Sequence, residues 1–193
     1  MEGWFPVKTT PNNGRIKAKR VLFALPDLGE EIPTIIEQKI VESGGNLIME
    51  ICSSDLPPVA MIKDGLLRLP SIRIYTLNGD AIICGDDQAI SPHKMWMMSK
   101  YLLDIFEGVE KIIGIAGSLD SIDVSKAERG NAAGVNALAV AIASAKGMNH
   151  ELILYPVHSE EASISKIISL AKLSIPGIIK PQKYDTIVNP ITT

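Results

Sequence analysis

The sequence predicts a three-layer α/β/α domain in which helices cover both faces of a mainly parallel β-sheet. Apolar runs of strand length, at residues 21–25 and 81–85, lack the alternation of a half-wet strand, so they are typical of strands buried on both faces. Between such runs, apolar residues recur at helical spacing. The pairs Asp64-Gly65 and Asn78-Gly79 favour hairpin turns and predict an antiparallel insertion between about residues 55 and 80.

The size and composition predict one globular domain. The chain has 193 residues, of which 46% are hydrophobic and 21% are charged. A chain of this size buries about 70% of the surface that its unfolded state exposes, and so much apolar side-chain surface excludes a disordered protein. The net charge of −3 argues against a nucleic-acid-binding protein, because such proteins carry an excess of positive charge.

Signals for targeting, membrane insertion and metal binding are missing from the sequence. The first residues lack a basic start and an apolar run, and no run reaches the roughly 20 apolar residues that span a bilayer, so we expect a cytoplasmic protein without membrane contact. Cys52 and Cys84 have no His or Cys nearby and are expected to be structural thiols. His93, His150 and His158 are far apart, so neither a metal nor a cofactor is expected.

The first half of the chain is expected to hold an arm, a strand, a helix and several short strands. Prolines and a basic cluster predict an extended N-terminal arm over residues 1–20. The strand at 21–25 leads into a helix that ends at Gly44-Gly45 and buries one face, made of Ile32, Ile35, Ile36 and Ile40. Short strands follow at 47–52, 59–63, 66–69 and 72–77. Apolar and polar residues alternate in the last of these, which predicts one wet face.

The second half continues the alternation of helices and strands. Ser91-Pro92 starts a helix whose apolar stripe is Met95, Met98, Leu102, Ile105 and Phe106. After a strand at 111–116, an Ala-rich helix at 131–146 carries small residues that are able to pack closely against a neighbour: Gly134, Ala137, Ala141 and Ala145. A strand at 152–155 and a helix at 159–173 complete a single domain over residues 21–175. Prolines predict a C-terminal tail over 176–193.

Three loops are predicted to meet at one edge of the sheet, because ligands of open α/β sheets bind outside the carboxyl ends of the strands. Together they supply a candidate polar pocket made of Asp27, Gly29, Gly85, Asp86, Asp87 and Gly117. One interpretation is a phosphorylase or hydrolase with Asp86 or Asp87 as its base, and another is a ligand sensor without turnover. The sequence has no nucleophile elbow and no phosphate-binding loop, so the third interpretation is that these aspartates cap helices and turns.

The helix that begins at Ser91-Pro92 carries apolar residues around most of its circumference. Trp96 and Met97 cannot share the face of Met95 and Met98. Either the helix is sandwiched between layers, or its second face meets another subunit, since Met and large aromatic residues are favoured at protein contacts. The candidate interface therefore consists of Met95, Trp96, Met97 and Met98, together with the loop at Pro57 and Pro58.

An ordered set of short motifs resembles the proteasome assembly chaperone family of archaea and eukaryotes. The motifs are LPDLG at 25–29, EI at 50–51, SDLPP at 54–58, KDG at 63–65, LRLPSIRIY at 67–75, GDDQ at 85–88 and the strand at 112–117. The resemblance implies a fold akin to nucleoside phosphorylases without their active site.

The same resemblance implies a non-enzymatic scaffold that forms homo-oligomers and contacts the α-subunits of the 20S proteasome. Several family members use a C-terminal tail of the form hydrophobic-Tyr-any residue. This chain has Thr192 where that tyrosine would stand, so docking by the tail is not expected. Our first hypothesis is a chaperone or scaffold that acts by protein–protein contacts. The alternative is a small-molecule phosphorylase- or hydrolase-like enzyme that uses the acidic loops.

Overall fold

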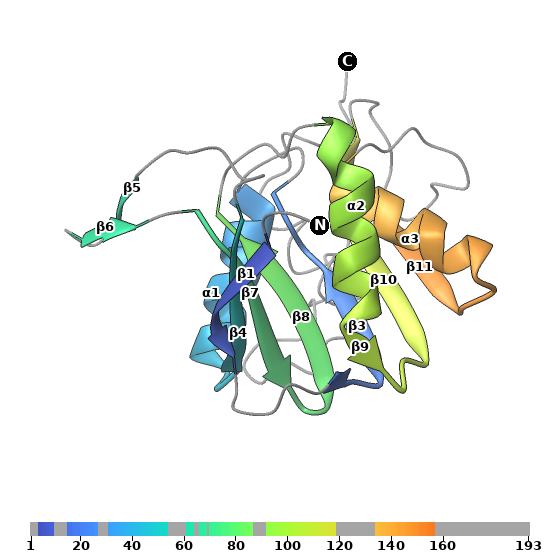
Figure 1. Cartoon of the computed structure of the whole chain (residues 1–193), viewed down its shortest axis with the longest axis horizontal. Coiled ribbons are helices and arrows are strands. Elements are labelled where there is room, and N and C mark those ends of the chain that lie inside the picture. The colour runs from blue at the N-terminus through green and yellow to red at the C-terminus, as the bar shows by residue number, and fades with distance from the viewer. Residues whose placement is uncertain are drawn as a thin grey trace, which may run out of the picture.

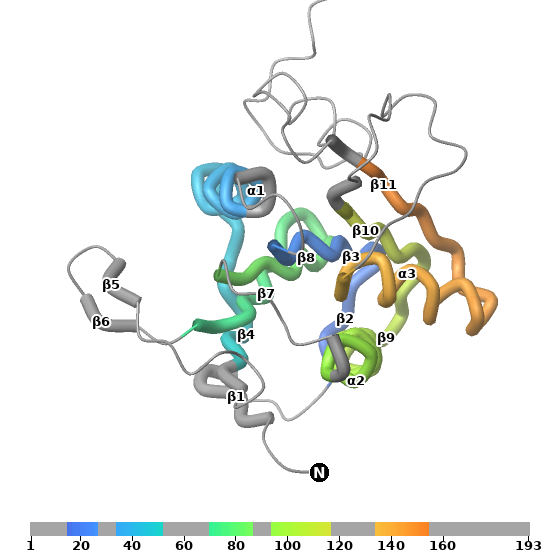
Figure 2. Tube along the Cα trace, turned by 90° about the horizontal axis from the view of Figure 1, so that it is seen from above, coloured from blue at the N-terminus to red at the C-terminus, as the bar shows by residue number. Residues whose placement is uncertain are grey.

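The computed structural model describes residues 4–9, 15–26, 31–53, 61–63, 66–68, 70–86, 92–118 and 134–156. These residues form a seven-stranded sheet with helices on both faces (Figures 1 and 2). Helix α1 (Glu31–Glu42) covers one face. Helices α2 (Pro92–Asp104) and α3 (Val135–Ala145) lie side by side on the other face. The predicted α/β class is confirmed.

The strands of the main sheet follow the order β1-β4-β7-β8-β3-β10-β11. Their bounds are β1 (Trp4–Thr9), β3 (Arg20–Phe23), β4 (Asn46–Ser53), β7 (Ile72–Leu77), β8 (Asp80–Gly85), β10 (Lys111–Ser118) and β11 (His150–Pro156). Strands β8, β3, β10 and β11 are mutually parallel, whereas β1, β4, β7 and β8 pair antiparallel. Five of the seven strands therefore point the same way, and the sheet is mostly parallel.

The predicted antiparallel segment divides between the main sheet and a small separate sheet. Strand β7 lies inside the main sheet, between β4 and β8, because Ile72 and Ile74 are buried in the core. Strands β5 (Met61–Lys63) and β6 (Leu66–Arg68) pair with each other in a separate two-stranded sheet. The turn between β7 and β8 confirms the Asn-Gly prediction, because Asn78 and Gly79 have φ values of 53° and 85°.

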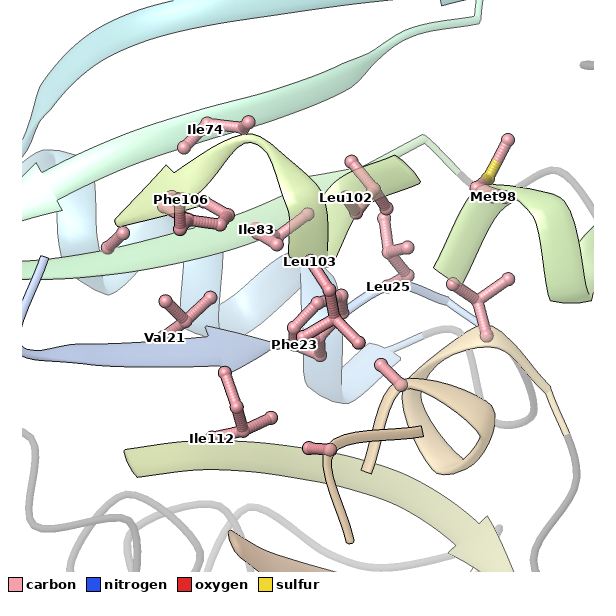
Figure 3. Close-up of a cluster of buried hydrophobic side chains, with 14 of the residues drawn as sticks. Val21, Phe23, Leu25, Ile74, Ile83, Met98, Leu102, Leu103, Phe106 and Ile112 are labelled. Atoms are coloured by element: carbon pink, nitrogen blue, oxygen red, sulfur yellow. The ribbon is translucent and has the colours of Figure 1, made fainter. Parts of the chain in front are cut away.

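The sheet separates two hydrophobic cores. On one face, Ile36 and Ile40 of α1 pack over Leu22, Ile82 and Cys84, as the isoleucine spacing predicted. On the other face, Met98 and Leu102 of α2 meet Phe23, Leu25 and Ile83, as Figure 3 shows. Alternate residues of the same strands therefore point into opposite cores.

The small-residue face predicted for the Ala-rich helix is only partly buried: Gly134 is buried and Ala137 is half-buried. Helix α3 buries Val135, Asn136, Ala139, Val140, Ile142 and Ala143, whereas Ala141 and Ala145 are exposed. The polar Asn136 side chain points inward and binds the backbone of Leu25 and of Ile115 in β10. Close packing instead comes from Gly114 of β10, where an added Cβ would lie 2.6 Å from Val140 Cγ2.

The structure also places parts of the predicted N-terminal arm. Residues 4–9 form β1, which pairs with β4 at the edge of the main sheet. Strand β2 (Ile16–Lys17) pairs with β9 (Phe106–Glu107), just beyond the end of α2. The predicted helix at 159–173 and the predicted tail at 176–193 lie outside the described residues. No helix within the described ranges combines the length and apolar character needed to cross a membrane.

Candidate functional site

The strand ends that were expected to form a pocket do lie together. Strands β8, β3 and β10 are parallel neighbours, so their carboxyl ends share one edge of the sheet. Gly85 is the last residue of β8, and Gly117 is the next-to-last residue of β10. Asp27, Gly29 and Asp87 lie outside the described residues. Of the three aspartates predicted at this edge, Asp86 lies among the described residues, and its contacts follow.

Asp86 is held by Arg73 of β7. Arg73 Nη1 donates to Asp86 Oδ2 at 2.8 Å, and Nη2 donates to Oδ1 at 2.9 Å, which is a two-pronged ion pair. The backbone N–H of Ser71 donates to Asp86 Oδ2 at 3.0 Å. Only 9% of the Asp86 side chain and 12% of the Arg73 side chain are exposed.

The same guanidinium binds a second carboxylate, from the helix that covers this face. Arg73 Nε and Nη2 donate to the two oxygens of Glu37 of α1, at 2.5 and 2.9 Å. Nη1 also donates to Ser71 Oγ at 3.0 Å, and that hydroxyl donates to Glu50 of β4. All five N–H groups of Arg73 therefore have an acceptor. We call Glu37, Arg73, Asp86 and Tyr75 the Arg73 cluster.

The electrostatics of the Arg73 cluster favour ion pairs over a free catalytic group. Burial opposes the charge of Arg73, but the hydrogen bonds to Glu37 and Asp86 outweigh it and raise the pKa of Arg73 above its usual value. Tyr75 donates from its hydroxyl to Glu37 Oε1 at 2.7 Å. Burial, with that hydrogen bond, raises the pKa of Tyr75 above its usual value, so the phenol stays neutral.

The wet face predicted for β7 is wrong. The side chains of Arg73 and Tyr75 do point away from the Ile72–Ile74 face, but α1 covers them and supplies Glu37 as their partner. The sequence carries only a weak signal for this role, because Glu37 follows the buried Ile36 and precedes Ile40 by three residues. An acidic residue beside a buried helical stripe is more often solvated.

Two further contacts fill the space around the carboxyl ends of the strands: one at Gly85 and one at Asn136. A Cβ added at Gly85 would lie 2.9 Å from Leu25 Cδ2, so the neighbouring strand end fills the space beside this glycine. Asn136 of α3 accepts from Leu25 N at 3.1 Å and donates to Leu25 O and Ile115 O, each at 2.7 Å. Within the described part of this edge, the polar side chains of Asp86 and Asn136 form hydrogen bonds that join neighbouring elements.

A different arrangement is found on α2. Trp96 and Met97 have 54% and 53% of their surface exposed, whereas Met98 is fully buried in the core and Met95 is half-buried. The helix is therefore not sandwiched along the side that carries Trp96 and Met97. Pro57 and Pro58 lie outside the described residues. Among the described residues, no three His, Cys, Asp or Glu side chains are grouped so that they could hold a metal ion.

Comparison with known proteins identifies the fold. No protein-family model matches the chain, and no curated protein matches its sequence. Among solved structures, it is similar to Pyrococcus furiosus PbaA, an archaeal homolog of proteasome-assembly chaperone (TM-score 0.64, 16% identity, covering 89% of this chain and 87% of that one). P. furiosus PbaB, an archaeal proteasome activator, has a TM-score of 0.63 and 17% identity over 91% of both chains. A Thermoplasma acidophilum protein of unknown function has a TM-score of 0.61 and 18% identity, covering 86% of this chain and 79% of that one. Identities this low show a shared fold alone.

Proposed function

We propose that this protein is a non-enzymatic chaperone or scaffold that acts on proteasome subunits through protein–protein contacts. The observation that carries the proposal is the similarity of about nine-tenths of the chain to PbaA and PbaB at TM-scores above 0.6. The family resemblance of the sequence motifs supports the same assignment. A cytoplasmic, homo-oligomeric protein with 20S α-subunits as partners is part of this proposal, as is a three-layer fold related to nucleoside phosphorylases.

The exposed side chains of α2 support a role in binding proteins. Trp96 and Met97 are large apolar groups that stay in contact with water in the single chain. Aromatic residues and methionine are enriched at protein interfaces, where their burial stabilises the complex. A chaperone of this kind would cover the unpaired interface of a partner until the final subunit replaces it.

The contacts of Asp86, the candidate catalytic base, do not support the enzymatic alternative. A general base must be able to accept a proton from a substrate, within hydrogen-bond reach of it. Both oxygens of Asp86 already accept hydrogen bonds from Arg73, and Oδ2 also accepts from the Ser71 backbone. We therefore assign Asp86 a role in holding α1, β7 and β8 together.

The proposal is tested by capture of proteasome subunits. The full chain, carrying an affinity tag, is expressed in the organism that encodes it, and captured proteins are identified by mass spectrometry. We expect 20S α-subunits among them, and purified α-subunits should bind the purified chain directly in size-exclusion chromatography.

Turnover of a small molecule in a metabolite screen would contradict the proposal. If no α-subunit binds, and turnover of a nucleoside or phosphoester is found that Asp86→Asn abolishes without changing the circular dichroism of the protein, the protein is an enzyme. The control for that screen is Lys39→Gln, which changes an exposed charge on the outer side of α1.

A further inference from the structure

Two consecutive methionines of α2 lie in opposite surroundings. Met97 has 53% of its surface exposed, whereas its neighbour Met98 is fully buried in the hydrophobic cluster that Figure 3 shows. Successive side chains of an α-helix point about 100° apart around the helix axis, so one of these side chains enters the core while the other reaches the surface. The helix therefore exposes one thioether to small solutes and shields the next.

The outer side of α2 around Met97 consists of side chains that do not belong to the core. Trp96 is 54% exposed, and Lys100, one helical turn further along, is also exposed. The core contacts of the helix come from other positions, among them Met98 and Leu102. A chemical change at Met97 therefore alters the surface of the domain without removing a contact from its core.

The chemistry open to an exposed thioether is oxidation by a peroxide, which yields methionine sulfoxide. The sulfur lone pair attacks one oxygen of hydrogen peroxide, and an S–O bond forms as the O–O bond breaks. The other oxygen takes up the proton of the transferred hydroxyl and leaves as water. The sulfur is oxidised and the peroxide is reduced, so the step needs no further reactant. Methionine sulfoxide reductases reverse it with electrons from a dithiol.

The thiol of Cys84 does not compete for peroxide. Its side chain is fully buried in the core on the α1 side of the sheet. Burial raises the pKa of this thiol well above its usual value, so it stays protonated. Because the thiolate is the form that oxidants attack, Cys84 stays reduced under conditions that oxidise an exposed methionine.

We propose that Met97 is a site of reversible oxidation, at which a peroxide converts the exposed thioether into a sulfoxide. The sulfoxide is polar, so oxidation makes the outer side of α2 more polar while Met98 and the core stay unchanged. Burial of an apolar side chain favours association, and burial of an unpaired polar group opposes it. Oxidation of Met97 therefore weakens any complex that covers this side chain. The inference goes beyond the proposed function and does not depend on what covers α2.

The first experiment maps oxidation along the full chain. The folded protein is treated with dilute hydrogen peroxide, the reaction is stopped with catalase at intervals, and each methionine is followed by peptide mass spectrometry. We expect Met97 to be oxidised at least about tenfold faster than Met98. The half-buried Met49, Met95 and Met148 should react at intermediate rates. In urea these differences should disappear, because unfolding exposes every methionine.

The second experiment measures the surface and the fold of the oxidised protein. Oxidation should shorten retention on a hydrophobic-interaction column, and a methionine sulfoxide reductase with a dithiol should restore it. Circular dichroism and the midpoint of urea unfolding should stay unchanged. Met97→Leu is the test variant, because leucine has a similar volume and is not oxidised by peroxide, so its retention should not respond. Met148→Leu is the matched control and should respond like the original chain.

Four results would overturn the inference. The first is an equal rate of oxidation for Met97 and Met98 in the folded chain. The second is the same loss of retention in Met97→Leu as in the original chain, and the third is no recovery with the reductase. The fourth is loss of the native circular dichroism when Met97 is the oxidised residue.

Capture of α-subunits separates this inference from the proposed function. If α-subunits bind the chain but Met97 is not oxidised selectively, the proposed function stands and this inference fails. If Met97 is oxidised and reduced as expected but no α-subunit binds, the oxidation site stands and the proposed function fails.

Discussion

Arg73 shows how a single residue can join three elements. Its guanidinium binds Glu37 of α1 and Asp86 at the end of β8, while its own strand β7 supplies the backbone. Forming such a pair removes charged groups from water, so it adds less stability than its short distances suggest. Breaking it is different, because the remaining carboxylates would stay buried without a partner of opposite charge.

The first prediction concerns this residue. Arg73→Met should lower the free energy of unfolding by about 3–5 kcal/mol, measured by urea denaturation, because Glu37 and Asp86 then face each other without the guanidinium. Arg73→Met combined with Glu37→Gln and Asp86→Asn should recover much of that loss. Lys39→Met changes an exposed pair and serves as the control. A loss below about 1 kcal/mol, typical of surface pairs, would contradict this account of the cluster.

The position of α3 depends on one glycine and one asparagine. Gly114 lies in the middle of β10, and an added Cβ would meet Val140 Cγ2 at 2.6 Å and Asn136 O at 2.9 Å. The Asn136 side chain then binds the backbone of Leu25, just beyond β3, and of Ile115 in β10. The helix is thus seated against the parallel strands by a close approach and by three buried hydrogen bonds.

The second prediction tests the close approach. Gly114→Ala should lower the free energy of unfolding by about 1–3 kcal/mol, because the helix must shift to admit the methyl group. Val140→Ala in addition should relieve part of the clash and restore some of the stability lost by Gly114→Ala. The measurement is again urea denaturation. Equal stability of Gly114→Ala and the original chain would show that α3 moves away without cost.

Elements were predictable where the pattern is local. Isoleucine spacing located α1 and its buried side, and Asn78-Gly79 located the hairpin turn, because both depend on residues close in sequence. The packing face of α3 was not predictable from its small residues. It depends on where Asn136 meets strand backbone, and those partners lie 111 and 21 residues away.

At the scale of the whole molecule, the two hydrophobic cores share strands of one sheet. Strands β3, β8 and β10 place alternate side chains in both cores: Leu22, Ile82 and Ile113 face α1, while Phe23, Ile83 and Ile112 face α2 and α3. Loss of either core would leave one side of these strands in water, at a cost of about 25 cal/mol for each Å² of apolar surface.

The third prediction follows from this shared sheet. Ile36→Ala, on the α1 side, should lower the free energy of unfolding by about 2–5 kcal/mol. It should shift the urea transition equally by Trp96 fluorescence, which reports on the α2 side, and by far-ultraviolet circular dichroism. Trp4→Phe serves as the background, since it leaves Trp96 as the single tryptophan. Two separate transitions would show that the cores unfold independently.

The sequence by itself determined the α/β class, most of the described helices and strands, and the shared edge of the sheet at which β8, β3 and β10 end. It did so because apolar periodicity and turn residues act through neighbours along the chain. Only the tertiary structure decided that Arg73 binds both Asp86 and Glu37, and that Trp96 and Met97 remain in water while Met98 is buried. Those outcomes depend on the order of the strands and on which side each helix packs, so they join residues that no local pattern brings together.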